Sequence, residues 1–158
     1  MKKKKPTSSE ISTNKKARRD YEITQTYECG IELKGTEVKS IRAGKVNISD
    51  SFARVERGQV FLYGCDIQPW ETAGDFFQHL PKRSRRLLLH KMEIFKLEQL
   101  QAQKGCTLVA LKLYWKNGKV KLALGVGKGK THRDQRYDLK ARVELREAQR
   151  EVARINRR

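Results

Sequence analysis

Two alternating segments joined by an Asn-Gly dipeptide constrain the fold of this chain more than any other feature of its sequence. Residues 106–115 and 119–127 alternate apolar and polar side chains, and Asn117-Gly118 lies between them after Lys116. Asn-Gly between two such segments is typical of the two-residue turn of a β-hairpin. We therefore predict a long antiparallel hairpin at residues 106–127.

The alternation also assigns faces to this hairpin, because successive side chains of a strand point to opposite sides. One predicted face of the first strand carries Val109, Leu111, Leu113 and Trp115. The corresponding face of the second strand carries Val120, Leu122, Leu124 and Val126. We expect these two faces to be buried in a common core.

Further short strands are predicted at residues 20–34, 51–56 and 59–65, the last two joined by a tight turn at Arg57-Gly58. Gly30 interrupts the first of them and is expected to mark a bulge or a sharp bend. The strands follow one another at short spacing, and no strand–helix–strand rhythm appears. The pattern favours a mainly β fold, a small closed or half-closed antiparallel β-barrel.

Helical patterns interrupt the strands at residues 35–44 and 90–105. The apolar run Leu87-Leu88-Leu89 fits either a buried strand or the start of a helix, and its periodicity does not decide between them. Residues 67–83 read as a loop because they contain Pro69, Gly74 and Pro81. Aromatic residues in this loop are expected to cover one end of the barrel; they are Trp70, Phe76 and Phe77.

The charge is strongly positive and concentrated at the two ends of the chain. Lys and Arg number 36 against 18 Asp and Glu, which gives a formal net charge of +18. The sequence divides into a basic flexible N-terminal arm at residues 1–19, a mildly basic β-barrel body at 20–127 and a basic C-terminal tail at 128–158. Nucleic acid is the first candidate partner for such a charge distribution. An anionic membrane is the second candidate, and purely solubilising charge is the third.

The tail contains a helical pattern from Tyr137 onward, with no Gly or Pro. Its arginines recur every four residues and are expected to form one ridge along the helix: Arg142, Arg146, Arg150 and Arg154. Like charges at this spacing weaken an isolated helix. We expect a helix that is marginal alone and firmer when phosphates neutralise the ridge.

No catalytic, metal or cofactor site is predicted. The three histidines lie far apart in the sequence, the three cysteines form no CxxC pair, and residues 125–130 lack the spacing of a phosphate-binding loop. The chain is therefore not expected to be an enzyme. No run of 18 apolar residues occurs and no apolar stretch follows the lysines after Met1, so we expect a cytoplasmic protein with reduced cysteines.

Five blocks of sequence resemble the SsrA-binding protein family, small protein B (SmpB). They are NKKARRDY at 14–21, GTEVKSIRAGKVNISDS at 35–51, RRLLLHKMEI at 85–94, LVALKLYWKNGKVK at 108–121 and GVGKGK at 125–130. The resemblance runs from about Asn14 to the tail. It implies an oligonucleotide-binding-like antiparallel β-barrel with about three helices and a basic C-terminal tail.

The resemblance also implies a function in bacterial trans-translation, without catalysis. Members bind the tRNA-like domain of transfer-messenger RNA (tmRNA) and bring it, charged with alanine and together with elongation factor Tu, to stalled ribosomes. The tail is thought to enter the empty mRNA channel near the decoding region of the small subunit and to become helical there. Accordingly, the expected partners are tmRNA and the stalled ribosome, with elongation factor Tu as an indirect partner. The protein is expected to be a monomer that binds no membrane.

Matching positions transfer the family's functional residues to this chain. The implied RNA-binding residues are Glu28, Lys39, Arg42, Lys45, Asn47, Leu88, Lys121 and Lys128. The ribosome-channel residues expected in the tail are Asp134, Arg136, Lys140 and Arg142 from the family pattern, together with the remaining ridge arginines, Arg146, Arg150 and Arg154. Gln135 departs from the pattern, since many members have Lys there. Two rivals stay open: a ribosomal or general RNA-binding protein of the same barrel class, and a noncatalytic subunit of an RNA-processing enzyme.

Overall fold

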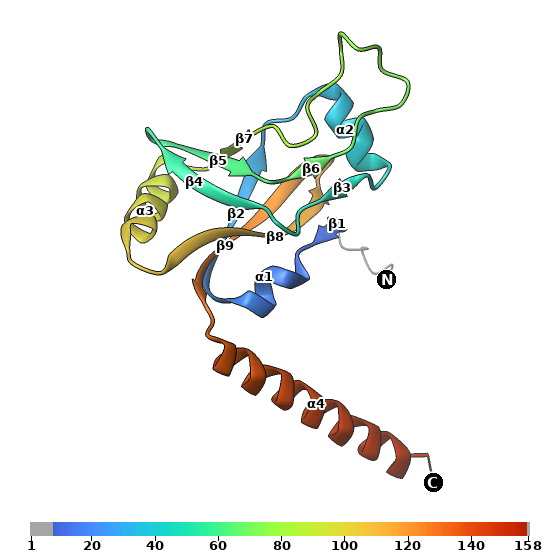
Figure 1. Cartoon of the computed structure of the whole chain (residues 1–158). Coiled ribbons are helices and arrows are strands. Elements are labelled where there is room, and N and C mark those ends of the chain that lie inside the picture. The colour runs from blue at the N-terminus through green and yellow to red at the C-terminus, as the bar shows by residue number, and fades with distance from the viewer. Residues whose placement is uncertain (1–7, 158) are drawn as a thin grey trace, which may run out of the picture.

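A computed structural model describes residues 8–157 of the chain, which form a ring of strands with a long helix extending from it (Figure 1). In chain order the elements are β1 (Ser8–Thr13), α1 (Lys15–Asp20), β2 (Tyr21–Ile31), α2 (Gly35–Arg42), β3 (Val46–Asn47), β4 (Phe52–Glu56), β5 (Gln59–Tyr63), β6 (Asp66–Ile67), β7 (Arg85–Leu88), α3 (Lys91–Ala102), β8 (Cys106–Lys116), β9 (Lys119–Gly129) and α4 (His132–Ile155).

Seven strands form one antiparallel sheet that closes on itself. The order is β1-β8-β4-β5-β7-β2-β9, and β8 also pairs with β9, which completes the ring. One edge of β8 serves two strands: β4 pairs with its first half and β1 with its second half. β3 and β6 form a separate two-stranded sheet. The predicted mainly β, antiparallel, oligonucleotide-binding-like fold is therefore confirmed.

Both predicted hairpin turns are present. Asn117 and Gly118 have φ values of 51° and 73°, and Arg57 and Gly58 have the same two values. Two successive residues with positive φ produce the turn whose twist matches that of the flanking strands. The chain therefore reverses tightly between β8 and β9 and between β4 and β5.

The predicted face of β8 is correct for the second half of the strand and wrong for the first half, because the strand contains a bulge. Its register with β9 shifts between Ala110 and Lys112. Leu113 and Trp115 pack in the main core, as predicted, but Val109 and Leu111 belong to a second cluster. One extra residue in a strand moves every later side chain to the opposite face. The predicted inner face of β9, from Val120 to Val126, is confirmed.

The second cluster lies under α1, a helix that the sequence did not predict. Ala17 of α1 packs with Val109, Leu111 and Ala123, and Tyr21 and Ile23 pack against this group. Residues 8–19 thus form a strand and a helix that contact the ring, where the sequence suggested a flexible arm. Residues 1–7, the rest of that arm, lie outside the described residues.

Asn14 attaches α1 to the ring. Its side chain is buried, and its Nδ2 donates to the carbonyls of Ile48, at 3.1 Å, and Ala110, at 2.9 Å. Its Oδ1 accepts a hydrogen bond from the backbone N–H of Ala17 at 2.9 Å, which caps the helix. A single amide therefore satisfies the helix end and joins three segments that are distant in sequence.

A buried ion cluster joins α2 to β7. Glu37 and Arg85 are both fully buried, and Arg85 Nη2 lies 2.8 Å from Glu37 Oε1. Arg83 donates to both carboxylate oxygens at 2.7 Å, and the Lys34 N–H donates at 2.8 Å. Arg85 also donates to three backbone carbonyls, those of Cys65, Pro81 and Arg83. Every polar atom of the pair thus has partners, as buried charges require.

The loop between β6 and β7 differs from its prediction. Phe76 and Phe77 are 90% and 73% exposed, so they do not cover an end of the ring. His79 is the buried residue of this loop, with Nε2 2.9 Å from the Ile67 carbonyl oxygen and Nδ1 2.8 Å from Thr36 Oγ1. The ambiguous segment after it is a strand, β7, because Leu87 has a place in the core.

Two of the three cysteines are buried as expected. Burial raises the pKa of Cys29 to about 12 and that of Cys65 to about 11, so both thiols are protonated at neutral pH. Cys106, at the start of β8, is only half-buried. No disulfide is therefore needed to explain their positions in the core.

The tail forms α4, which extends away from the ring (Figure 1). All of its side chains are exposed except those of Gln135 and Asp138, which are half-buried. Thr131 and Asp134 cap its N-terminus reciprocally: Thr131 Oγ1 accepts from the Asp134 N–H, and Asp134 accepts from the Thr131 N–H. Within residues 8–157, no helix is both long enough and apolar enough to cross a membrane.

Replacing Glu37 by Gln should destabilise the fold by about 3–5 kcal/mol at neutral pH, because two buried or half-buried arginines lose their counter-charge. Burial raises the pKa of Glu37, but hydrogen bonds from Arg83 and Lys34 and the charge of Arg85 outweigh burial and lower it. Its contribution is therefore complete above the unfolded-state value of about 4.3 and is lost as pH falls through the lower folded-state value.

Urea denaturation at neutral pH and at about pH 3 checks this prediction. The stability difference between Glu37→Gln and wild type should narrow at low pH, because below about 4.3 the unfolded wild-type carboxyl is protonated and must lose its proton on folding. Glu32→Gln is the matched control, since Glu32 forms an exposed ion pair with Arg86 at 3.0 Å. Equal effects of the two substitutions would contradict a special role for the buried cluster.

Candidate nucleic-acid interface

The outer face of β2, β9 and β8 carries a hydrogen-bonded group centred on Glu28. Its carboxylate accepts from the Tyr114 hydroxyl at 2.5 Å and from Lys116 Nζ at 3.0 Å. β9 lies between β2 and β8, and there Glu28 pairs with Ala123 while Tyr114 pairs with Lys121. The small side chain of Ala123 leaves room for the phenol to reach across the intervening strand.

The electrostatics of this group fix its protonation. The hydrogen bonds from Tyr114 and Lys116 lower the pKa of Glu28. Burial, together with the hydrogen bond to Glu28, raises the pKa of Tyr114 to about 12. At neutral pH the group is therefore a carboxylate held between a neutral phenol and an ammonium. Lys112 Nζ lies 5.3 Å from the centre of the Tyr114 ring, which adds a second cation to the aromatic side chain.

Next to this group, a groove of about 390 Å³ runs between α2 and the tip of the β8–β9 hairpin. We call it the hairpin groove. Its lining is mainly apolar with a basic edge: Leu33, Val38, Leu88, Trp115, Lys119 and Lys121. A shallow apolar floor beside lysines offers surface to both the bases and the phosphates of a nucleic acid.

Gly30 allows Leu88 to lie in this groove. The strand stays in register at Gly30, which pairs with Leu88 on one side and with Lys121 on the other. The expected bulge at Gly30 is therefore absent, and the bulge of β2 lies between Ile23 and Gln25. A Cβ atom at position 30 would lie 3.2 Å from the Cβ of Leu88, so a larger residue would push Leu88 away by a few tenths of an ångström.

Four of the residues implied by the family resemblance come together here. Leu88 and Lys121 line the groove, and Glu28 is close enough to Lys121 for its charge to act on the carboxyl. The Arg42 guanidinium lies 5.8 Å from the centre of the Trp115 ring. Arg42 thus extends the basic edge of the groove from the side of α2.

The other implied residues of the ring lie apart from the groove or at its periphery. Lys39 is exposed on α2, and Lys45 pairs with Glu71 at 2.5 Å. Asn47 accepts a hydrogen bond from the Ser49 N–H at 2.9 Å, which organises its own turn. Lys128 is at the far end of β9, about 23 Å of strand away from Lys121. It therefore belongs to a different surface.

The tail residues occupy one exposed helix. Asp134 caps α4, and hydrogen bonds from Thr131 lower the pKa of the Asp134 carboxyl. Arg136 and Lys140 border a hollow on the first turns of the helix. The predicted ridge arginines are all exposed: Arg142, Arg146, Arg150 and Arg154.

Sequence reasoning missed Tyr114, Trp115 and Lys116. The alternation of β8 does place Tyr114 and Lys116 on the same face as Lys112, so part of the signal was present. The sequence does not show that this face meets Glu28, because that contact depends on the register of three strands. The ring therefore creates this group from residues that are 86 and 88 positions apart in the sequence.

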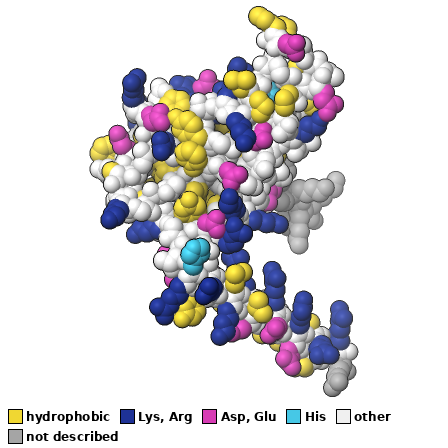
Figure 2. Space-filling model, viewed as in Figure 1, with side chains coloured by type: hydrophobic (Ala, Val, Ile, Leu, Met, Phe, Trp, Pro, Cys, Tyr) yellow, Lys and Arg dark blue, Asp and Glu magenta, His cyan; other side chains and the backbone are white. Residues whose placement is uncertain are grey.

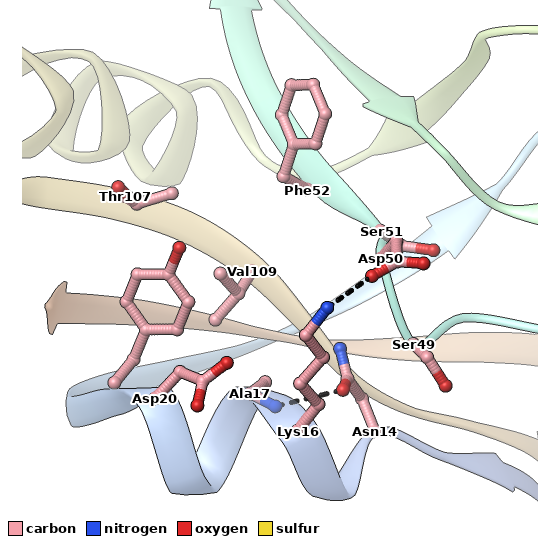
Figure 3. A pocket seen from close by; sticks show the side chains of 11 residues that line it. Asn14, Lys16, Ala17, Asp20, Ser49, Asp50, Ser51, Phe52, Thr107 and Val109 are labelled. Carbon is pink, nitrogen blue, oxygen red and sulfur yellow. Dashed lines mark hydrogen bonds and ion pairs between the residues drawn. The ribbon is translucent and has the colours of Figure 1, made fainter. Parts of the chain in front are cut away.

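A second hollow, of about 210 Å³, lies between α1 and the start of β4 (Figure 3). Lys16 and Asp50 form an ion pair across it at 2.8 Å, and Asp20, Ser49 and Thr107 also line it. Lys16 and Asp50 are thus paired with each other, and Asp20 pairs with Arg19 at 3.0 Å. Within residues 8–157, no group of three His, Cys, Asp or Glu side chains is placed to hold a metal ion.

Comparison with known proteins matches nearly all of this architecture to one family. A family model described as SmpB protein matches residues 11–154, which include the ring, both sides of the hairpin groove and almost all of α4. The SsrA-binding protein of Anoxybacillus flavithermus is 56% identical over 147 residues, covering 93% of this chain and 92% of its own. The SsrA-binding protein of Bacillus subtilis is 54% identical over 140 residues, covering 89% of each chain.

A solved structure gives the same result. It is described as "tmRNA-SmpB: a journey to the center of the bacterial ribosome", and one of its chains is 47% identical to this one, with a TM-score of 0.64. The match covers 79% of this chain and 91% of that chain. The fold comparison and the sequence comparison therefore identify the same family.

The Glu28 group makes a prediction that does not depend on any ligand. Tyr114→Phe removes the hydrogen bond that contributes most to the low pKa of Glu28, so this pKa should rise towards its ordinary value of about 4.3. Carbon NMR of the labelled carboxyl measures it directly. Tyr137→Phe is the control, because Tyr137 is exposed on α4. An unchanged Glu28 titration in Tyr114→Phe would show that the hydrogen bond has no influence.

Proposed function

The chain belongs to the SmpB protein family, and we propose that it binds the tRNA-like domain of the SsrA RNA, tmRNA, and delivers it to stalled ribosomes. The observation that carries this function is the family match from residue 11 to residue 154, which covers the ring and the tail together. We infer the RNA from the relatives, which are described as SsrA-binding proteins. We infer the ribosome from the similar solved structure, whose description names the bacterial ribosome.

We propose that the ring contacts the RNA through the hairpin groove and the Glu28 group. A structured RNA is bound mostly through phosphates, 2′-hydroxyls and unstacked bases. Lys121 and Arg42 supply positive charge, while Leu88 and Trp115 supply apolar surface for a base. The many Lys and Arg side chains on the surface in Figure 2 add a non-specific attraction.

Glu28 would act in this contact through its neighbours. A free carboxylate on such a face repels phosphate, but this one is paired with Lys116 and hydrogen-bonded to Tyr114. These contacts fix the phenol above the sheet and remove much of the negative charge. We therefore assign Glu28 the positioning of Tyr114 and Lys116 rather than a direct attraction for RNA.

Lys39, Lys45 and Asn47 would extend the contact along the side of α2 and β3. Lys128 lies too far from the hairpin groove for Lys128 and Lys121 to contact the same face of one RNA stem. We assign it to a second basic surface, near the start of α4, that faces either another part of the RNA or the ribosome.

The tail would act on the ribosome. The arginine ridge of α4 is exposed and does not pack against the ring. It can therefore contact the phosphates of RNA that lines a channel. Asp134 and Thr131 start the helix at a fixed position, from which Arg136, Lys140 and the ridge follow. Gln135 is half-buried beside this start, where many relatives would place a charged lysine.

The proposed activity is binding and delivery, with no chemical step by this chain. Alanine and elongation factor Tu reach the ribosome with the RNA, so they are indirect partners. This work requires the compartment in which bacterial ribosomes translate, and we place the protein in the cytoplasm as a monomer.

Lys121→Ala should weaken binding to the tRNA-like domain several-fold and reduce the slope of log affinity against log salt by about 0.7–0.9, because one phosphate contact is lost. Gel-shift or fluorescence titration at several salt concentrations measures both quantities. Lys96→Ala on α3 is the matched control, since Lys96 is exposed and does not line the groove. If wild type binds any RNA duplex with equal affinity, specific recognition of this RNA is wrong.

A chain that ends after Lys130 should keep the ring and most of its tmRNA affinity but lose tagging of nascent chains on stalled ribosomes. The strands end at Gly129, and the removed helix contributes no side chain to either core cluster. Replacing the four ridge arginines by Gln should reproduce this loss with little change in helix propensity. A tail-less chain that still supports full tagging would contradict the assignment, as would one that no longer binds tmRNA.

A further inference from the structure

The loop between β6 and β7 presents a large apolar surface that no other part of the ring covers. It projects beyond α2 in Figure 1, and Figure 2 shows hydrophobic and acidic side chains at the tip of this projection. Phe76, Phe77 and Leu80 are 90%, 73% and 74% exposed. The two phenyl rings contact each other edge to face, with their centres 5.2 Å apart. The two phenylalanines thus form one exposed apolar patch, with a third exposed apolar residue close by in the sequence, and such patches are typical of interaction sites.

The base of this loop is held in a defined conformation. The Gln78 side chain donates to the Trp70 carbonyl at 2.8 Å and accepts from the Trp70 N–H at 3.1 Å. Below it, buried His79 contacts Ile67 and Thr36, and the Ile67 N–H donates to the Pro81 carbonyl at 3.0 Å. A loop fixed at its base presents its tip in a restricted range of positions, which reduces the entropy lost on binding.

The charge of this segment is opposite to that of the chain. In a sequence of net charge +18, no Lys or Arg occurs between Gly58 and Pro81, while Asp66, Glu71 and Asp75 do. Glu71 pairs with Lys45 from outside the segment. Asp75, next to the two phenylalanines, forms no ion pair with any residue in the described range 8–157. The apolar tip is thus bordered by negative charge.

We propose that Phe76 and Phe77 dock into an apolar pocket rimmed by Lys or Arg on a protein component of the ribosome. This partner rests on the proposed function, which brings the chain to the ribosome. Aromatic side chains are the commonest anchors of protein interfaces. RNA is the less favourable partner for the loop, because a phosphate backbone would approach Asp75 with no cation of the segment to attract it.

The side-chain test compares a double alanine variant of the loop with a single alanine variant of an exposed phenylalanine elsewhere. Phe76→Ala combined with Phe77→Ala should lower the affinity of the SsrA RNA complex for purified stalled ribosomes on the order of tenfold or more. Phe95→Ala is the matched control, because Phe95 is 55% exposed on α3. Both variants should bind the isolated tRNA-like domain as wild type does. If wild type itself does not bind that RNA, the proposed function fails, whatever the loop does.

The charge test separates a protein partner from RNA by the sign of the effect. Asp75→Lys should weaken ribosome binding if the rim of the pocket is basic, and it should strengthen binding if phosphates face the loop. Glu98→Lys on α3 makes the same change in net charge at an exposed position and corrects for bulk attraction. Stronger binding of Asp75→Lys than of Glu98→Lys would overturn the proposal.

Photocrosslinking identifies the partner directly. A benzophenone amino acid replaces Phe76 in the full chain, which is bound with SsrA RNA to purified stalled ribosomes and irradiated. A crosslink to one ribosomal protein, at an apolar surface site bordered by Lys or Arg, is the expected result. A crosslink to ribosomal RNA would overturn the proposal. Absence of any crosslink together with unchanged affinity of the double alanine variant would overturn it as well.

Discussion

The buried pair of Glu37 and Arg85 is the interaction on which the functional side of this molecule depends. Burying an unpaired charge is very costly, so the carboxylate and the guanidinium must stay together. Glu37 is next to Val38, which lines the hairpin groove from α2. Arg85 lies three residues before Leu88, which lines the groove from β7. The ion pair therefore sets the distance between α2 and β7, which each contribute a side chain to the groove. Arg85 also binds the carbonyls of Cys65 and Pro81, so the same side chain fixes the base of the projecting loop.

A polar tie at this position complements the apolar core of the ring. Inside the ring, Leu, Ile and Val side chains fill the space between strands and stabilise it without directional bonds. At the ring's end, α2 has only Ile41 in that core, and apolar contact alone would leave its orientation poorly defined. The hydrogen bonds of Glu37 have fixed lengths and directions. They give one orientation of α2, and hence one position for Arg42 above Trp115.

The features that could be predicted from sequence were local, and those that could not depend on distant residues. Asn117-Gly118 and Arg57-Gly58 identify their turns because few residues adopt positive φ. The bulge at Leu111 was missed, since alternation contains no sign of one extra residue until the partner strand is known. α1 was missed because its burial rests on Asn14 and Ala17, which reach carbonyls and side chains about a hundred residues away. Likewise, Glu28 and Lys121 came from family motifs, whereas Tyr114 joins them only through the register of the ring.

The arrangement of charge would allow the ring to make the two proposed contacts, with the RNA and with the ribosome, at once. Lysines and arginines follow the sheet face and α4, while the segment from Gly58 to Pro81 has none. A polyanion wrapped on the basic face would leave this segment uncovered, because its acidic residues repel phosphate. Helix α4 starts at the Thr131–Asp134 capping box, and Lys130 holds its first turns by pairing with Asp138 at 2.5 Å. The proposed entry of its ridge into an RNA channel would leave the ring undisturbed, because the two core clusters contain none of the side chains of α4. Separation of the contacts along the chain lets each form without competing for the same arginines.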